Sequence, residues 1–181
     1  QGKALYVGIS KYPPAQAKIA YEMLRAAGVP CLISQYRYSM FDRTVEEKSL
    51  PLAAEQGSGF IAFSPLAQGL LTKKYLHGIP EHSRAARSTG FLKVDQVTED
   101  KVGKARRLDE IAARRGQTLA EMALAWVLKD ERMTSVIVGT SSVKQLADNL
   151  HALDYLNFSN EELAEIEGIY RLYIKKWEKS L

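Results

Sequence analysis

The chain has 181 residues, long enough for one compact domain with a sizeable core. It is 46% hydrophobic and 25% charged, as is usual for globular proteins, and no apolar run approaches the roughly 18 residues of a membrane-spanning helix. The net charge of +4 is spread along the chain without basic tracts interleaved with aromatic residues, so we expect no nucleic-acid binding and no membrane insertion.

Strands and helices alternate along the chain. Apolar runs bounded by glycine, proline or serine predict strands at 4–10, 29–34, 59–63 and 134–139. Apolar residues at helical spacing predict helices at 15–27, 101–115, 118–128, 141–153 and 159–173. A further short helix is expected after Thr44, where Pro51 interrupts or restarts it. Between 71 and 98 no pattern is visible, and a loop of that length is often functional or mobile.

Several helix ends carry recognisable signals. Proline before residue 15 suits a first helical turn, and Gly28 suits a helix C-terminus. A serine or threonine followed three residues later by glutamate predicts a capping box at Thr44, Thr118 and Ser159. The apolar stripe expected on the helix 15–27 is Ile19, Met23 and Leu24. The stripe expected on the helix 101–115 is Val102, Ala105, Leu108 and Ile111.

The predicted strands are continuously apolar and do not alternate, so the run 59–63 reads as a strand buried on both faces. This pattern is typical of a parallel sheet covered by helices. A closed eight-stranded barrel needs roughly 200 residues or more, so four βα units predict either half a barrel or a small doubly wound sheet. No G-x-G-x-x-G turn follows the first strand, which favours the half barrel.

The chain opens on Gln1, with neither a methionine nor a signal peptide, and enters a strand almost at once. We therefore expect it to have been cut from a longer polypeptide. Cys31 is the only cysteine and lies in a predicted strand. It cannot form an internal disulfide, which predicts an inert core residue in a reducing, cytoplasmic setting.

The stretch Ser64–Leu71 follows the strand 59–63 and contains a proline and a glycine. In parallel α/β sheets ligands bind at the turns after the carboxyl ends of the strands, so we expect this stretch to line a binding site. We expect the stretches that follow the other three predicted strands to line the site in the same way. The histidines show neither metal-ligand spacing nor a nucleophile partner, and we expect them on the surface or in loops. They are His77, His82 and His151.

Taken together, the four strand ends resemble the C-terminal half of an aldo-keto reductase. The nearest branch contains potassium-channel β subunits and glyceraldehyde-3-phosphate reductases. The most specific stretch is 63–71, Phe-Ser-Pro-Leu-Ala-Gln-Gly-Leu-Leu, continuing through Lys74-Tyr75, 78–80 and Ser83-Arg84. The other matching stretches are 7–10, 34–36 and 137–141, with Gln145, Leu146 and Asn149. The resemblance implies an α/β fold in which 1–181 forms strands five to eight of a (β/α)8 TIM barrel plus a C-terminal helix.

The resemblance also implies NADP as cofactor. Ser10 and Gln35 match the pair that hydrogen-bonds the nicotinamide carboxamide, and an amide suits glutamine because both carry a donor and an acceptor. Phe63 matches the ring that stacks behind the nicotinamide. Lys11 stands where many relatives have asparagine or arginine. The turn implied to wrap the diphosphate through backbone N–H groups is Ser64, Pro65, Leu66, Ala67, Gln68 and Gly69.

Two basic residues, Lys74 and Arg84, match those that close over the diphosphate in the family, and both side chains suit phosphate. Ser141 is expected at a helix start, as an N-cap and an anion site. The residues implied to hold the adenosine 2′-phosphate and adenine are Gly139, Ser141, Gln145, Asp148 and Asn149. Relatives usually have glutamate where Asp148 stands.

In this family hydride passes from NADPH to an aldehyde or ketone, and an Asp/Tyr/Lys/His tetrad from the first half of the barrel supports the transfer. No residue of this chain matches that tetrad, so we expect no catalytic residue here and no activity of the chain alone. Half a barrel leaves unpaired edges and an uncovered inner face, which predicts either a homo-oligomer or a missing N-terminal half-barrel. The alternatives are a channel β-subunit-like regulatory module that binds nucleotide and, outside this family, a flavodoxin-like binding domain.

Overall fold

The computed structural model describes residues 2–83, 85–86 and 91–178, and from residue 172 onward it describes the backbone alone. The chain packs as two compact units. One comprises Gln1–Pro65 and Val127–Gly139, and the other comprises Leu66–Trp126 and Thr140–Leu181.

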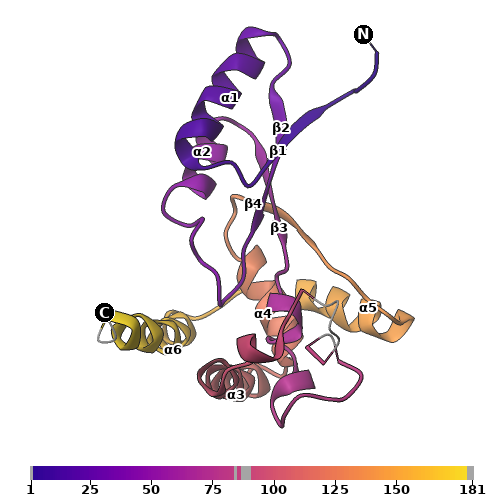
Figure 1. The fold of residues 1–181 in the computed structure, drawn as a ribbon, viewed down its shortest axis with the longest axis vertical. Helices are drawn as coiled ribbons and strands as arrows, with labels where there is room; N and C mark the ends of the chain where they lie inside the picture. Colours follow the sequence, from indigo (N-terminus) through magenta and orange to yellow (C-terminus); the bar gives the residue numbers. More distant parts are fainter. Residues whose placement is uncertain (1, 84, 87–90, 179–181) are drawn as a thin grey trace. The chain divides into compact units, whose positions relative to one another are not determined.

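The first unit is built on a four-stranded parallel sheet (Figure 1). Its strands are β1 (Val7–Ser10), β2 (Cys31–Arg37), β3 (Gly59–Phe63) and β4 (Met133–Ile137). All three pairings are parallel, and the spatial order β1-β2-β3-β4 follows the order along the chain. A doubly wound sheet reverses its strand order at a switch point. This sheet contains no reversal, which excludes the flavodoxin-like alternative.

Two helices, α1 (Pro14–Ala26) and α2 (Ser49–Glu55), cover one face of this sheet (Figure 1). The signals at the ends of α1 are confirmed, because Pro14 occupies the first turn and Gly28 follows the helix with a φ of 72°.

The apolar stripe predicted for α1 is largely wrong. Ala17 and Tyr21 are buried with Ile9 and Cys31, and of the predicted stripe only Leu24 packs against this cluster. The other two residues of the stripe, Ile19 and Met23, are 57% and 68% exposed. Positions 17, 21 and 24 lie on one side of a helix, and positions 19 and 23 lie on another. Packing against the sheet selected the first side.

The sheet is fully covered on one face only. In β3, Phe60 and Ala62 are completely buried, whereas Gly59, Ile61 and Phe63 are half-buried. The expectation that this strand is buried on both faces is therefore wrong. Alternate side chains of a strand point to opposite faces, and α1 and α2 cover only the face that carries Phe60.

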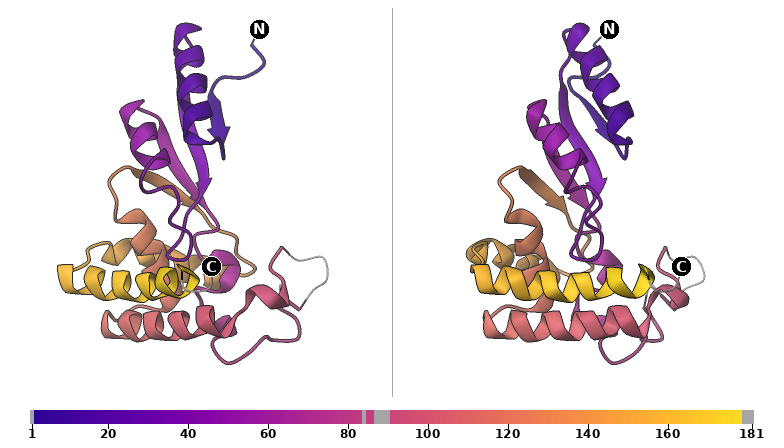
Figure 2. Two further views of the ribbon diagram at one scale, coloured as in Figure 1. Left: turned by 60° about the vertical axis from the view of Figure 1, so that its left-hand side comes forward. Right: turned by 90° about the vertical axis from the view of Figure 1, so that its left-hand side faces the viewer.

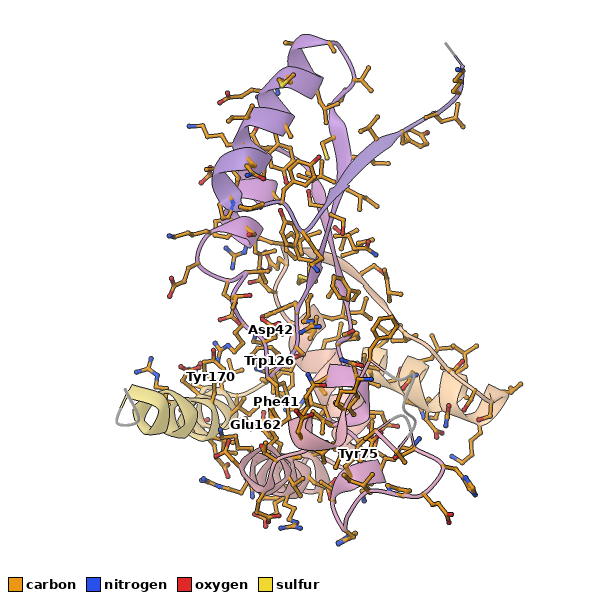
Figure 3. All side chains as sticks on the ribbon, in the orientation of Figure 1. Phe41, Asp42, Tyr75, Trp126, Glu162 and Tyr170 are labelled. Atoms are coloured by element: carbon orange, nitrogen blue, oxygen red, sulfur yellow. The ribbon has the colours of Figure 1, made fainter. Side chains whose placement is uncertain are left out.

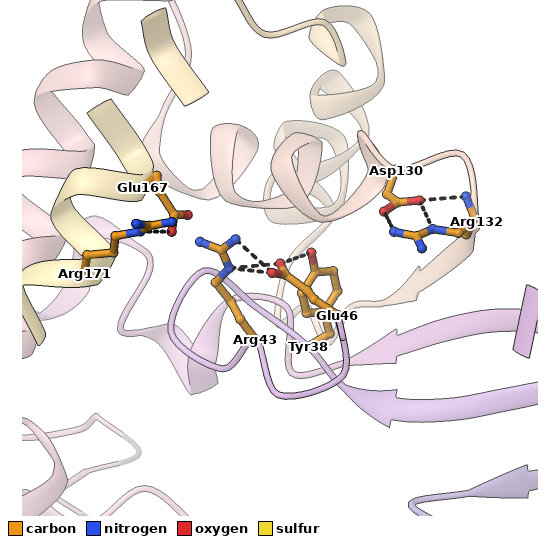
Figure 4. A network of polar contacts seen from close by, with 7 residues as sticks. All are labelled: Tyr38, Arg43, Glu46, Asp130, Arg132, Glu167 and Arg171. Atoms are coloured by element: carbon orange, nitrogen blue, oxygen red, sulfur yellow. Dashed lines mark hydrogen bonds and ion pairs between the residues drawn. The ribbon is translucent and has the colours of Figure 1, made fainter. Parts of the chain in front are cut away.

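The capping box predicted at Thr44 does not form. Residues 44–48 are turns, α2 begins at Ser49, and Pro51 lies in its first turn. The Thr44 hydroxyl donates to Asp42 Oδ1 at 2.9 Å. Glu46 accepts bonds from the Tyr38 hydroxyl at 2.7 Å and from the Arg43 side chain at 2.8–3.0 Å (Figure 4). These side-chain bonds compete with the helical arrangement and hold the segment in turns.

The second unit is helical. Its first elements are 3-10 turns at Ala67–Gly69, Lys73–Tyr75 and Val94–Gln96. The α-helices that follow are α3 (Glu99–Arg114), α4 (Leu119–Leu128), α5 (Val143–Leu150) and α6 (Asn160–Glu178), with a 3-10 helix at His151–Tyr155 between the last two. The last two residues of α4 belong to the first unit. Between Leu71 and Thr98 the described residues contain no strand or α-helix, as predicted. Helices α3 and α6 lie side by side (Figure 2).

Most helix signals in the second unit are confirmed. The capping boxes at Thr118 and Ser159 form, because each side chain accepts from the backbone N–H three residues later and the glutamate there accepts from the cap N–H. The predicted stripe of α3, from Val102 to Ile111, is buried. In the part of the chain that the structure describes, no helix combines the length and apolarity needed to cross a bilayer.

Candidate functional site

Ser10 and Gln35 lie side by side at the carboxyl edge of the sheet. They are register partners on β1 and β2, and the Ser10 hydroxyl donates to Gln35 Oε1 at 3.5 Å. The backbone N–H of Lys11 donates to the Gln35 carbonyl at 3.0 Å, which ties the end of β1 to β2. Ser10 is exposed and Gln35 is half-buried, so a hydroxyl and a carboxamide are both available to a ligand at this edge.

Phe63 ends β3 on the open face of the sheet. Gln35 is in register with Ile61, and Arg37 with Phe63. Residues in register share a face, and so do residues two apart in a strand. Phe63 and Gln35 therefore point to the same face, opposite to the face that carries Phe60. The half-buried ring of Phe63 is placed where a flat ligand at this edge could stack on it.

Strained backbone marks the predicted site. Among the described residues, the non-glycine residues with positive φ are Lys11, Ser64, Ala67 and Gln68, with φ between 47° and 60°. A left-handed conformation costs a non-glycine residue about 1–2 kcal/mol. Such strain persists only where the surroundings enforce it, and it concentrates at functional sites. Each of the four follows a strand end, at a position implied to bind cofactor, so backbone strain is evidence for the site that does not depend on the resemblance.

The turn after β3 presents free backbone donors. Leu66 has φ −92° and ψ 15°, and the next three residues, Ala67, Gln68 and Gly69, all have positive φ. A right-handed residue followed by left-handed ones directs successive N–H groups to one side, forming a nest for anions. The N–H groups of Leu66, Ala67 and Gln68 meet no acceptor within the described ranges, while that of Gly69 donates to the Leu66 carbonyl at 2.8 Å. A diphosphate suits such donors.

Of the residues predicted around α5, Ser141 and Gln145 contact each other, and Asp148 pairs with Lys144, which was not predicted. Ser141 donates to Gln145 Oε1 through its backbone N–H at 2.9 Å and its hydroxyl at 3.0 Å. Lys144 pairs with Asp148 at 2.8 Å. The prediction that Ser141 is the N-cap is wrong: the N-cap is Ser142, whose hydroxyl accepts from the Gln145 N–H at 3.2 Å. Because α5 begins at Val143, Ser141 lies one residue outside the helix and its side chain bonds Gln145 instead.

The remaining predicted residues are less defined. Lys74 is exposed within the 3-10 turn Lys73–Tyr75, Asn149 is half-buried on α5, and Gly139 is exposed shortly after β4. Arg84 lies outside the described residues. Two polar residues contact the turn at Gly69: Thr72, which the sequence analysis did not single out, and Tyr75, which it named only as part of the matching stretch. The spacing of Thr72, three residues after a glycine in a turn, is a signal that could have found it.

Three buried tyrosines hold their phenolic protons more tightly than a free tyrosine does. Burial raises the pKa of Tyr36 to about 12, and burial also raises the pKa of Tyr21 and Tyr38. A general acid near neutral pH needs a lowered tyrosine pKa. Within the described ranges, no three His, Cys, Asp or Glu side chains cluster as metal ligands. The predicted location of the histidines is confirmed, since all three are exposed.

Comparison with known proteins adds independent evidence. A model of the aldo/keto reductase family matches residues 1–171. An L-glyceraldehyde 3-phosphate reductase of Escherichia coli O157:H7 is 48% identical over 170 residues, and one of Escherichia coli strain K12 is 46% identical over 170 residues. Each alignment covers 92% of this chain but 49% of the relative. The chain thus spans about half the length of the curated relatives it matches.

Proposed function

Because the chain belongs to the aldo/keto reductase family, as its strand ends predict, we propose that residues 1–181 are the C-terminal half of a (β/α)8 reductase barrel. In this proposal β1 to β4 are barrel strands five to eight, and α6 is the C-terminal helix. The sequential parallel order of the strands supports it, since consecutive barrel strands are neighbours. The half-length match to the relatives supports it as well.

The uncovered surfaces of the first unit support the same proposal. Among the described residues, β1 and β4 each pair on one side only. Beside β1, Leu5 and Tyr6 are 89% and 72% exposed, and Ile19 and Met23 of α1 are exposed too. Exposed apolar residues near an open strand edge are typical of a surface that another element covers. We assign that element to the other half of the barrel or, for the chain alone, to a second copy.

The cofactor of this proposal is NADPH, which supplies the hydride. Ser10 and Gln35 would hold the nicotinamide carboxamide, Phe63 would stack on the ring, and Lys11 would lie beside them. The observation that carries the assignment is the strained turn after β3, where N–H groups with no acceptor among the described residues suit a diphosphate. The residues assigned to the diphosphate are Ser64, Pro65, Leu66, Ala67, Gln68, Gly69, Lys74 and Arg84.

The adenosine end is assigned to the residues around α5. The backbone N–H and the hydroxyl of Ser141 both donate to Gln145 Oε1, so these two donors converge on one point, where a phosphate oxygen would take the place of the amide oxygen. We assign the 2′-phosphate to this pair, with Asp148, Asn149 and Gly139 near the adenine. This assignment predicts a preference for NADPH over NADH.

The reaction proposed for the whole protein is hydride transfer to the carbonyl carbon of an aldehyde or ketone, in the cytoplasm. This chain would bind and orient the cofactor, and the proton donor would come from polypeptide outside these 181 residues. The relatives named above are reductases of a phosphorylated aldehyde, which supports a small carbonyl substrate. Their names favour an enzyme over a channel-associated regulatory module.

The test uses protein expressed from the full reading frame and follows NADPH and NADH binding by fluorescence. We expect Ser141→Ala to weaken NADPH about tenfold and to leave NADH unchanged, because only NADPH carries the 2′-phosphate. Ser142→Ala is the matched control. It removes the N-cap of α5, costs about 1 kcal/mol of stability, and should leave the NADPH/NADH ratio unchanged. Absence of NADPH binding by the wild type would refute the proposal.

A further inference from the structure

We propose that Thr72 and Tyr75 are positioning residues that hold the turn Leu66–Gly69 in its diphosphate-binding conformation. The inference rests on the proposed function and extends it to two side chains that need not touch the cofactor themselves. It concerns the second unit alone, where the contacts that support it all lie.

Thr72 joins the turn to the segment that carries Lys74. Its hydroxyl donates to the Gly69 carbonyl at 2.7 Å and accepts from the Lys74 backbone N–H at 3.2 Å. One hydroxyl therefore closes the end of the strained turn and caps the 3-10 turn Lys73–Tyr75. The Lys74 backbone is fixed by this bond, while its side chain remains exposed. A shift of the Thr72 hydroxyl would therefore move both the turn and the backbone of Lys74.

Tyr75 supports the turn from within the unit. It is 1% exposed, and its Cε2 lies 3.3 Å from the place where a Cβ on Gly69 would stand. The ring therefore packs against Gly69, whose φ is 103°. The Tyr75 hydroxyl accepts from the backbone N–H of Ala85 at 3.4 Å (Tyr75 is labelled in Figure 3). Ring and hydroxyl together link the turn to the backbone at Ala85, which is itself buried.

The same segment is anchored to α3. Arg106 Nε donates to the Leu76 carbonyl at 2.9 Å, and Leu76 and Leu71 are buried. Strained backbone persists only where packed surroundings hold it, and binding sites gain precision when rigid elements support them. Thr72 and Tyr75 lie between the turn and this anchor. Their bonds to Gly69 and Ala85 therefore restrict movement of the turn whose N–H groups would bind the diphosphate.

Thr72 provides a matched pair of variants. Thr72→Val has nearly the same shape but loses the hydroxyl, whereas Thr72→Ser keeps it. With protein from the full reading frame, we expect Thr72→Val to weaken NADPH binding about tenfold and Thr72→Ser to stay within about twofold of the wild type. Tyr75→Phe keeps the ring against Gly69 and loses only the bond to Ala85, so we expect a loss of about threefold.

A second ligand separates positioning from general destabilisation. Adenosine 2′-monophosphate keeps the 2′-phosphate but lacks both phosphates of the diphosphate, so Thr72→Val should bind it as the wild type does. Equal NADPH affinity in Thr72→Val and the wild type would overturn the inference. Equal loss of both ligands would also overturn it, by showing a merely structural role. A wild type that binds neither ligand would refute the proposed function itself, which is a different outcome.

Discussion

Gly8 of β1 lies closer to the neighbouring strand than any other residue type would allow. A Cβ at this position would stand 2.8 Å from the Ile33 carbonyl oxygen, and that atom belongs to a paired strand that cannot rotate away. We expect Gly8→Ala to lower the free energy of unfolding by about 1–3 kcal/mol, measured by urea denaturation.

Gly103 in α3 is the control for this substitution. A Cβ there meets no atom within 4 Å, and alanine is the better helix former. Gly103→Ala should therefore raise stability by about 0.5–1 kcal/mol. If both variants changed stability in the same direction, the clash with Ile33 would not be the cause.

Tyr36 makes stability sensitive to alkaline pH. Burial raises its pKa to about 12, its hydroxyl donates to the Tyr12 carbonyl at 2.8 Å, and its ring stacks on Phe60 at 5.1 Å. The unfolded chain releases the phenolic proton near pH 10, and the folded chain holds it until about pH 12. This contribution to stability is complete below pH 10 and is lost as the pH rises toward 12.

The corresponding measurement is the free energy of unfolding in urea between pH 9 and 12. The wild type should lose stability steadily over this range. Tyr36→Phe keeps the stacking, loses about 1 kcal/mol at neutral pH through the missing hydrogen bond, and should show a shallower decline. Tyr21 and Tyr38 contribute with the same sign, so the decline should not vanish. Parallel curves for the two proteins would contradict the prediction.

At the scale of elements, Arg115 joins the end of α3 to the segment before α6. Its side chain is 7% exposed. It donates to the carbonyls of Tyr155 at 3.2 Å and Asn157 at 2.9 Å, pairs with Glu162, and lies 3.8 Å above the Phe158 ring. Few side chains other than arginine can satisfy so many partners, because its fork of donors is planar and rigid.

We expect Arg115→Lys to cost about 1–3 kcal/mol of stability, because a lysine cannot make all the bonds of this buried guanidinium to Glu162 and the two carbonyls. Arg114→Lys is the matched control, since Arg114 pairs with Glu165 on the exposed surface and should cost about 0.5 kcal/mol or less. Urea denaturation of both variants decides between them. Similar losses of stability in the two variants would show that the burial of Arg115 does not strengthen its contacts.

At the scale of the whole molecule, the open sheet edges predict association. The 181-residue chain by itself should form dimers or higher oligomers that cover the exposed apolar residues Leu5, Tyr6, Ile19 and Met23. Native mass spectrometry and light scattering at low concentration measure this. A stable dilute monomer would contradict the prediction.

Substitutions on α1 locate the surface involved. Met23→Lys places a charge in the apolar surface and should weaken association at least tenfold. Glu22→Gln raises the net charge by the same one unit at an exposed polar position on another side of the same helix and should have little effect. Equal effects would mean that net charge, and not the apolar surface, controls association.

The local features of the fold could be predicted from the sequence. The strand Gly59–Phe63, the capping boxes at Thr118 and Ser159, and the glycine that ends α1 all depend on residues within a few positions of one another. The strand ends also carried the family resemblance, because the turn after β3 has a distinctive composition. Local chemistry decides such features, so a sequence without coordinates is enough to find them.

Features that depend on competing contacts needed the tertiary structure. The stripe of α1 could not be predicted because two sides of the helix carry apolar residues and the sheet selects one, with Ala17 and Tyr21 in place of Ile19 and Met23. Thr44 fails as a cap because Asp42 takes its hydroxyl, and Ser142, not Ser141, caps α5.

The candidate site divides in the same way. The resemblance is enough to propose Ser10, Gln35 and Gln68 as site residues from the sequence, but it does not reveal two features of their arrangement. The register pairs Ser10 with Gln35, and packing holds Ala67 and Gln68 in left-handed conformations that their own side chains disfavour. Strand pairing depends on residues far away in sequence, and the strain is enforced by packing that exists only once the chain has folded.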